Sequence, residues 1–324
     1  MYRSPITNHQ SPITDHRSKV QLSAMPPNPF LHSLGFSPTD RVVVFHADDI
    51  GSCHSSLAAY AGLLDFGVLS SAATMVPCGW FPATAALCRE HRDIPHLDMG
   101  VHLTLTSEWN TVRWGPISAR DPGSGLLDRE GYFYRRVGEV DAQADLAAVE
   151  IELRSQIDLA LAAGIDITHI DTHMLTLWQS RFAPLYIKLA EDYRVPPFMP
   201  RFQAEVLEQY GMDPGVAAQT ETLVNQLEDQ GLPVFDQWHV MSLQDTDDRL
   251  GQARRVLDAL QPGLTNFIVH PGLDTPELRA MAPDWPCRVA DFALFTNDAW
   301  RQAIAESGIQ VIGFRVLRDA MRKP

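Results

Sequence analysis

The chain has 324 residues, of which 45% are hydrophobic and 20% charged, and its formal net charge is −14 at pH 7. This acidic balance argues against nucleic acid and anionic membranes as partners, because both bind basic faces. The four cysteines form no CxxC pair, and no apolar run approaches the ~20 residues of a membrane span. We therefore expect a cytoplasmic protein with neither a zinc knuckle nor a disulfide framework.

Residues 1–38 differ in composition from the rest of the chain. The run Ser-Pro-Ile-Thr, followed by Asn-His or Asp-His, occurs twice, beginning at Ser4 and at Ser11, and prolines cluster after Met25. Segments of this kind bury little apolar surface. We expect a disordered or loosely attached tail, with Met25 as an alternative start, and we discount its histidines as ligands.

From Thr39 onward, strand-like runs alternate with helix-like segments, which is typical of a parallel sheet covered by helices. About seven such units favour a closed α/β barrel over an open sheet, as one domain spanning 39–324. Strands are expected at 42–46, 73–77, 98–105, 166–170, 236–240, 265–270 and 309–314, and helices at 55–66, 81–91, 143–163, 180–192, 216–230, 247–260 and 297–307.

The first strand leads directly into two adjacent carboxylates, Asp48 and Asp49, before a turn at Gly51. Catalytic groups of βα proteins gather at the carboxyl ends of strands. Two adjacent side chains face different ways, so one can hold a metal while the other handles a proton. The alternative is that one of them simply caps the following helix.

A single imidazole, His102, alternates with apolar residues in the strand at 98–105. A lone histidine of this kind is commonly structural. The segment that follows, 106–140, is rich in Gly, Pro, Trp and Arg and has no clear period. A long insertion after a strand that carries a candidate ligand is typical of a substrate-binding loop.

Three ionisable residues, His169, Asp171 and His173, occupy alternate positions at the end of the next strand. Such groups are costly to bury without a metal or one another, so the pattern favours a metal site or catalysis. Further along, an apolar strand ends in His270 before a Pro-Gly turn. That imidazole is either a functional group or a packing residue of the turn.

Four motifs, taken in order, resemble those of the YdjC/ChbG-type carbohydrate deacetylases, distant relatives of the NodB-like polysaccharide deacetylases. They are Ala47-Asp48-Asp49-Ile50-Gly51, Gly100-Val101-His102-Leu103, His169-Ile170-Asp171-Thr172-His173 and Val269-His270-Pro271-Gly272. The resemblance spans about 41–318 and implies a deformed (β/α) barrel.

The resemblance also implies roles for particular residues. Asp49, His102 and His173 would bind one divalent metal ion, with Asp48 as general base and His270 as general acid. The substrate implied is a small N-acetylated carbohydrate, whose acetamide is hydrolysed. Residues expected to support ligands or bind substrate are His169, Asp171, Arg201 and Arg288.

The donor types agree with this reading, because two imidazoles and one carboxylate leave coordination positions open. Mg or Zn is expected, and Co or Ni would also suit these donors. The sequence leaves a homodimer open.

The chain departs from the family pattern at three places. His46 stands where Asn is common, Ile50 replaces an aromatic residue, and Met174-Leu175-Thr176-Leu177 replaces a histidine-rich continuation. The ligand set survives these changes, whereas an altered pocket wall predicts an altered choice of sugar.

Two other functions fit parts of the pattern. His169, Asp171 and His270 match the two-His-one-carboxylate pattern of non-haem iron oxygenases, although those enzymes commonly have all-β folds. A non-catalytic sugar-binding relative is the other alternative. The presence of Asp48, which is not needed to hold a metal, argues against a pure binder.

Overall fold

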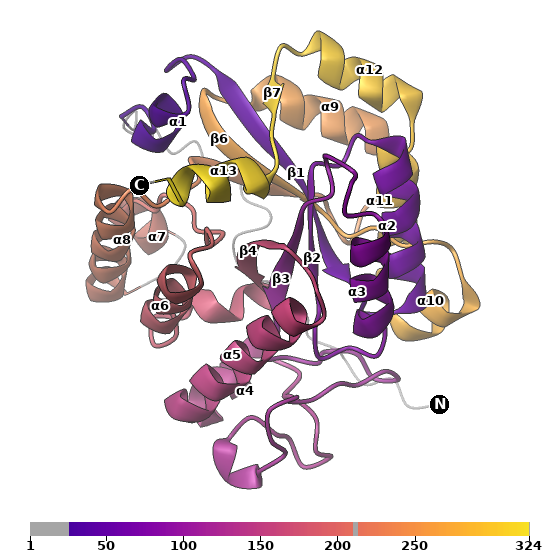
Figure 1. Ribbon diagram of the computed structural model, residues 1–324, viewed down its shortest axis with the longest axis vertical. Coiled ribbons are helices and arrows are strands. Elements are labelled where there is room, and N and C mark those ends of the chain that lie inside the picture. Colours follow the sequence, from indigo (N-terminus) through magenta and orange to yellow (C-terminus); the bar gives the residue numbers. More distant parts are fainter. Residues whose placement is uncertain (1–25, 210–212, 324) are drawn as a thin grey trace.

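The computed structural model describes residues 26–209 and 213–323. Seven parallel strands form one sheet, in which β4, β3, β2, β1, β6 and β5 follow one another and β7 pairs with β1 (Figure 1). The strands are β1 (Arg41–Ile50), β2 (Ser71–Thr74), β3 (Met99–Leu103), β4 (Ile167–Thr172), β5 (Gln237–Val240), β6 (Gly263–Val269) and β7 (Gln310–Val311). All seven expected strands are present, with shifted ends.

An irregular segment connects the two edge strands of this sheet. Parallel bridges join Ile170 of β4 to Pro197, and Pro200 to Phe235 just before β5. Prolines at 196, 197 and 200 remove backbone donors from the segment, so a regular ladder cannot form there. The sheet therefore closes through isolated bridges, which agrees with the expected deformed barrel.

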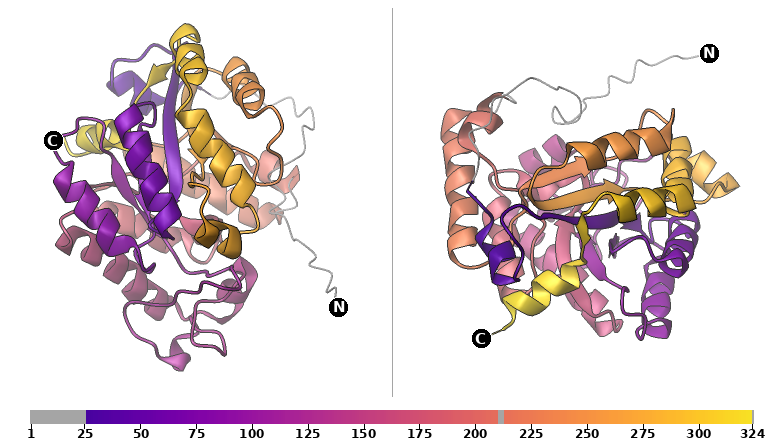
Figure 2. Two further views of the ribbon diagram at one scale, coloured as in Figure 1. Left: turned by 90° about the vertical axis from the view of Figure 1, so that its right-hand side faces the viewer. Right: turned by 90° about the horizontal axis from the view of Figure 1, so that it is seen from above.

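Helices cover the outside of the sheet (Figures 1 and 2). The longer ones are α2 (His54–Phe66), α3 (Phe81–Glu90), α5 (Leu146–Ala162), α6 (Ala183–Tyr193), α8 (Pro214–Asp229), α9 (Arg249–Ala259), α11 (Trp285–Phe295), α12 (Asp298–Glu306) and α13 (Phe314–Met321). The shorter ones are α1 (Pro29–Ser33), α4 (Val137–Gln143), α7 (Ala204–Gln209) and α10 (Pro276–Met281). In the described part of the chain, no helix combines the length and apolarity needed to cross a membrane.

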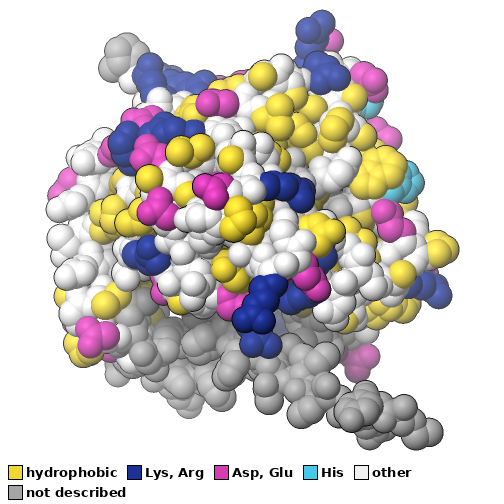
Figure 3. Space-filling model, turned by 90° about the horizontal axis from the view of Figure 1, so that it is seen from below, with side chains coloured by type: hydrophobic (Ala, Val, Ile, Leu, Met, Phe, Trp, Pro, Cys, Tyr) yellow, Lys and Arg dark blue, Asp and Glu magenta, His cyan; other side chains and the backbone are white. Residues whose placement is uncertain are grey.

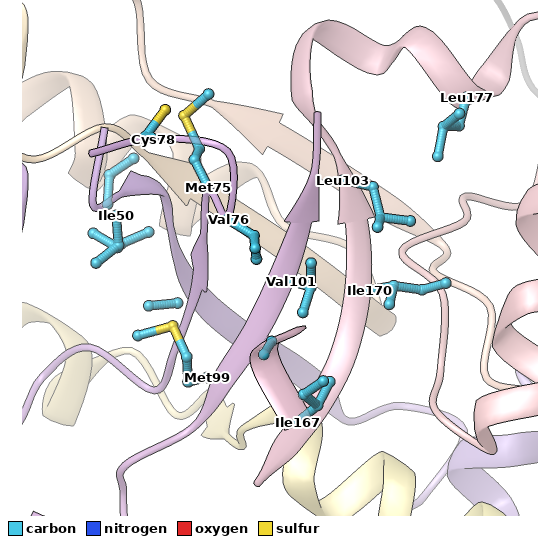
Figure 4. Packing of buried hydrophobic residues seen from close by; sticks show 14 of the residues in the cluster. Ile50, Met75, Val76, Cys78, Met99, Val101, Leu103, Ile167, Ile170 and Leu177 are labelled. Atoms are coloured by element: carbon cyan, nitrogen blue, oxygen red, sulfur yellow. The ribbon is translucent and has the colours of Figure 1, made fainter. Parts of the chain in front are cut away.

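Alternation along β3 separates the apolar core from the barrel interior. Met99, Val101 and Leu103 belong to the core that includes buried residues of α5, and Figure 4 shows them along the strand. Gly100 and His102 take the other face because side chains alternate along a strand. The imidazole therefore faces the inside of the barrel, as a site residue must.

The interior face of β1 changes character along its length. Val42 and Val44 are fully buried in an apolar cluster with Phe314 of α13. The next two residues with the same parity are His46 and Asp48. This apolar cluster, which we call the apolar plug, fills the amino end of the barrel interior. Toward the carboxyl end of β1, ionisable side chains follow it directly.

The expected tail requires a correction at residues 26–38. Phe30 and Leu31 of α1 are buried in the apolar plug, and the Asn28 side chain caps α1 while donating to the Val234 carbonyl at 2.9 Å. Two buried apolar residues and a capping Asn dock this short segment, so it packs against the sheet and is not a loose tail. The remaining part of the expected tail, 1–25, lies outside the described residues.

The insertion at 106–140 has little regular structure before α4. Its regular elements are a 3₁₀ turn at Pro122–Ser124 and bridges between Thr106 and Tyr134 and between Leu127 and Phe133. It lies at the bottom of Figure 1, and Figure 3 shows the molecule from that side with charged and apolar side chains interspersed. Its predicted role in binding substrate stays a prediction.

Candidate metal centre and active site

The carboxyl end of β1 turns sharply at the two adjacent aspartates. Asp49 has φ +63°, and the pairing of β1 with β2 shifts register between Ala47 and Ile50. A left-handed conformation is uncommon outside glycine, although Asp tolerates it better than most residues. The turn interrupts the strand alternation, and both Asp48 and Asp49 reach the ionisable layer inside the barrel.

Three donor atoms from three strand ends form a nearly equilateral triangle. Asp49 Oδ1 lies 3.4 Å from His102 Nε2 and 3.2 Å from His173 Nδ1, and the two nitrogens are 3.3 Å apart. Asp49 Oδ1 is buried without a hydrogen-bond partner among the described residues. Donors of a tetrahedral ion with bonds of about 2.0–2.1 Å lie about 3.3 Å apart. The triangle therefore fits a small divalent cation.

The outer nitrogen of each imidazole is held by a carboxylate. Asp171 Oδ1 lies 2.5 Å from His102 Nδ1, and Glu108 Oε2 lies 3.0 Å from His173 Nε2. Each pairing holds a ring proton on the outer nitrogen, so a bound cation would take the place of the inner proton, which faces Asp49. Burial opposes charge on His173, but Glu108 and Asp49 outweigh it and raise the pKa of this imidazole to about 9.

An arginine fixes the other oxygen of Asp49. The Arg288 guanidinium donates to Asp49 Oδ2 at 2.8 Å, pairs with Asp284 at 3.0 Å, and lies 5.3 Å from the ring of Trp109. Burial would raise the pKa of Asp49, but Arg288 and the two histidines hold it well below its ordinary value. Asp49 thus remains an anionic donor.

Asp48 lies in more open surroundings than its neighbour. One oxygen is 3.0 Å from His46 Nε2, and the other is 3.7 Å from His270 Nε2. The side chains of Asp48 and His270 are 14% and 13% exposed, whereas that of Asp49 is 3% exposed. A carboxylate and an imidazole that solvent can reach are therefore paired beside the buried donor triangle.

Most residues predicted from the sequence come together at this site. His169 does not join the triangle: its ring stacks on Phe314 at 3.8 Å, and Gly100 leaves room for it where a Cβ would collide. Arg201 is the clear exception, because its guanidinium pairs with Asp236 and Glu228, away from these residues. The expectation that Arg201 supports the site is therefore corrected: two carboxylates already neutralise it.

Sequence reasoning missed three residues of the site. Glu108 lies in the irregular insertion, Asp284 precedes a helix that was not predicted, and His46 was noted only as a departure from the family pattern. Only His46 had a signal in the sequence. Side chains two residues apart lie on the same face of a strand, so His46 and Asp48 share a face of β1.

Comparison with known proteins identifies the family of this chain. The family model described as "YdjC-like protein" matches residues 42–306. A protein named carbohydrate deacetylase from Thermus thermophilus is 32% identical over 281 residues, which cover 87% of this chain and 95% of the relative. The chain belongs to the YdjC-like family.

One further relative and one solved structure also resemble this chain. A carbohydrate deacetylase from Thermoanaerobacter pseudethanolicus is 23% identical over 86% of this chain and 100% of the relative. A crystal structure from Enterococcus faecalis, of a protein named for cellobiose-phosphate cleavage, has a TM-score of 0.67 at 20% identity and covers 86% of this chain and 99% of that one. At that identity, the likeness shows that the two proteins share a fold.

Proposed function

We propose that this YdjC-like protein is a metal-dependent carbohydrate deacetylase that hydrolyses the acetamide of an N-acetylated sugar or short oligosaccharide. The observation that carries the proposal is the unpartnered Asp49 Oδ1 facing two imidazole nitrogens, with the second carboxylate, Asp48, beside it. The names of the Thermus and Thermoanaerobacter relatives support the reaction class.

Asp49, His102 and His173 would hold the ion. A bound divalent cation polarises an amide carbonyl and acidifies water. Two nitrogens and one oxygen suit Zn, Co or Ni, whereas Mg prefers oxygen donors and keeps several waters. Zn or Mg is proposed, and reconstitution decides between them.

Asp48 and His270 would handle the protons of the reaction. Asp48 accepts a proton from the attacking water, whose oxygen bonds to the acetyl carbon. His270 donates a proton to the sugar nitrogen as the carbon–nitrogen bond breaks, so the products are acetate and a free amine. Asp48 Oδ2 lies 3.7 Å from His270 Nε2, beyond hydrogen-bond distance, so the proton that resets the pair would pass through a bridging water or after the two side chains move closer.

The turn after His173 supports an altered choice of sugar. Met174 and Leu175 follow His173 with φ of +52° and +56°, and Met174 is 42% exposed. Successive left-handed residues other than glycine are strained. We propose that this exposed apolar turn borders the substrate, which would make diacetylchitobiose an untypical substrate for this chain.

The geometry favours neither alternative function. Of the described residues, the groups whose donor atoms lie within 4.8 Å of one another include His169 with Asp171 and His46, but none of them contains His270. The facial triad expected for an oxygenase is therefore not assembled. A non-catalytic binder differs from the deacetylase in turnover, which an assay measures.

The test is acetate release from a panel of N-acetylated mono- and oligosaccharides. Metal-free protein is reconstituted separately with Zn, Mg, Co and Ni, and chelated protein serves as control. We expect release of acetate with at least one metal and none after chelation. Sugar binding without acetate from any metal-loaded form would make the protein a binder, and iron-dependent oxygen uptake would make it an oxygenase.

A further inference from the structure

His46 is fully buried, is no member of the donor triangle, and has no role in the reaction proposed above. Its Nε2 lies 3.0 Å from Asp48 Oδ1 and 2.9 Å from Asp171 Oδ2. The second oxygen of Asp171 holds His102. The imidazole therefore connects the candidate base on β1 with a metal-binding histidine on β3.

The hydrogen bonds around the ring define its protons. Nε2 faces two carboxylate oxygens, so it must carry a proton to avoid repulsion. Nδ1 lies 3.1 Å from Ser71 Oγ, whose own proton goes to Asp98 Oδ1 at 3.1 Å. Ser71 must then accept from Nδ1, and His46 carries a proton on both nitrogens.

Burial would lower the pKa of His46, but its contacts with Asp171 and Asp48 outweigh that effect and raise it to about 9. This direction agrees with the hydrogen-bond pattern.

Within the described parts of the chain, Asp48 has no comparable contact with another residue. Its Oδ1 is buried and has no hydrogen bond of good geometry within the described chain, and its Oδ2 is 3.7 Å from His270. The ion pair with His46 is therefore the closest interaction that orients this carboxylate. Asp171 in turn prevents the imidazole from swinging away.

We infer that His46 is a positioning residue that holds the Asp48 carboxylate toward the attacking water, an inference that rests on the proposed function. A displacement of a reacting group by about 1 Å can cost on the order of 10²-fold in rate. The donor triangle does not depend on this contact, because Asp171 holds His102 through its other oxygen.

Two substitutions distinguish the contributions of the two ring nitrogens of His46. His46→Asn retains a polar atom near the Nδ1 position but none at Nε2, whereas His46→Gln extends an N–H to the Nε2 position. We expect His46→Asn to lower kcat roughly 10- to 100-fold with KM and metal affinity unchanged, and His46→Gln to recover most of the loss.

A double-mutant cycle with Asp48→Asn tests whether His46 acts through Asp48. In the Asp48→Asn background, His46→Asn should cause no further loss of kcat. His169→Asn is the matched control, because it removes a neighbouring buried imidazole whose ring centroid lies 4.9 Å from that of His46. The loss of kcat caused by His169→Asn should multiply with the loss caused by Asp48→Asn. Multiplying losses for His46→Asn, or loss of metal from that variant, would overturn the inference.

Crystal structures provide a readout that does not require activity. In metal-loaded His46→Asn, the Asp48 carboxylate should turn away or adopt two orientations, while Asp49, His102 and His173 keep theirs. An unchanged Asp48 would contradict the inference even if kcat falls. Absence of acetate release by the wild-type protein would instead contradict the proposed function, and the orientation of Asp48 would still decide the role of His46.

Discussion

Two neighbouring regions of the site, built around adjacent aspartates, differ in how tightly they are held. Around Asp49, both carboxylate oxygens face fixed groups: Arg288 on one side, His102 and His173 on the other. Around Asp48, one oxygen faces His46, and the other lies 3.7 Å from the partly exposed imidazole of His270. The difference shows how one residue in a left-handed conformation can place two adjacent carboxylates in different surroundings, one suited to hold a cation and one suited to exchange a proton.

The largest expected effect comes from the tightly held region. Asp49→Asn removes the anionic donor of the triangle and leaves Arg288 buried beside a neutral amide. We expect loss of bound metal and of measurable acetate release, checked by metal analysis and by the assay. Retention of metal at the wild-type level would show that Asp49 is not a ligand.

The second effect separates the two regions. Asp48→Asn leaves the triangle intact but cannot accept a proton from water. Removal of a general base commonly lowers the rate by ~10²–10⁴-fold, so turnover should fall by that factor while metal content stays constant. If Asp48→Asn loses metal and Asp49→Asn retains it, the two roles are reversed.

The third effect concerns the support that the insertion gives to the triangle. Glu108→Ala removes the carboxylate 3.0 Å from His173 Nε2. Loss of such an outer partner typically lowers metal affinity 10–100-fold, which calorimetric titration of metal-free protein would measure. Glu139→Ala, which removes another glutamate outside the site, is the control and should bind metal normally. Equal affinities in the two variants would exclude a role for Glu108.

The sequence predicted most of this arrangement, and its omissions have physical causes. Strand ends such as Asp48–Asp49 and His270 were found because apolar runs lead directly to them. α11 was missed because Arg288 and Asp291 are buried in it, which obscures an amphipathic pattern. Glu108 was missed because an irregular loop has no period from which to infer a direction. Arg201 was misplaced because the sequence does not show its two carboxylate partners.

The fourth effect is a change of stability with pH that belongs to His46. Its pKa in the folded protein, about 9, exceeds the ordinary value of 6.5, so the protonated ring stabilises the fold below pH 6.5 and this contribution is lost as pH rises through 9. Between pH 6 and pH 9.5, the free energy of unfolding of the metal-free wild-type protein should fall by up to about 3 kcal/mol more than that of the His46→Gln variant. Urea unfolding of both proteins measures this difference, and parallel pH profiles would refute it.

The smallest effect on catalysis is expected at the opposite end of the barrel, in the apolar plug. Phe30 is 8% exposed and packs with residues of β1 and α13, far along the strand from the site. Truncation of a buried phenylalanine to alanine costs about 3–5 kcal/mol in a rigid core, and α1 is short enough to detach in part. We therefore expect Phe30→Ala to lower stability by about 2–3 kcal/mol with kcat, KM and metal affinity unchanged.

Two truncations extend this test of the amino-terminal segment. Removal of residues 1–38 should destabilise at least as much as Phe30→Ala, because Asn28 and Leu31 are lost as well. Removal of residues 1–25 alone is predicted to leave the melting temperature nearly unchanged. Reduced kcat in the truncated proteins, assayed well below their melting temperatures, would show that the plug and the site are coupled. The site would then depend on more than the residues that surround it, and the contrast between the two aspartates would have a cause outside their immediate neighbours.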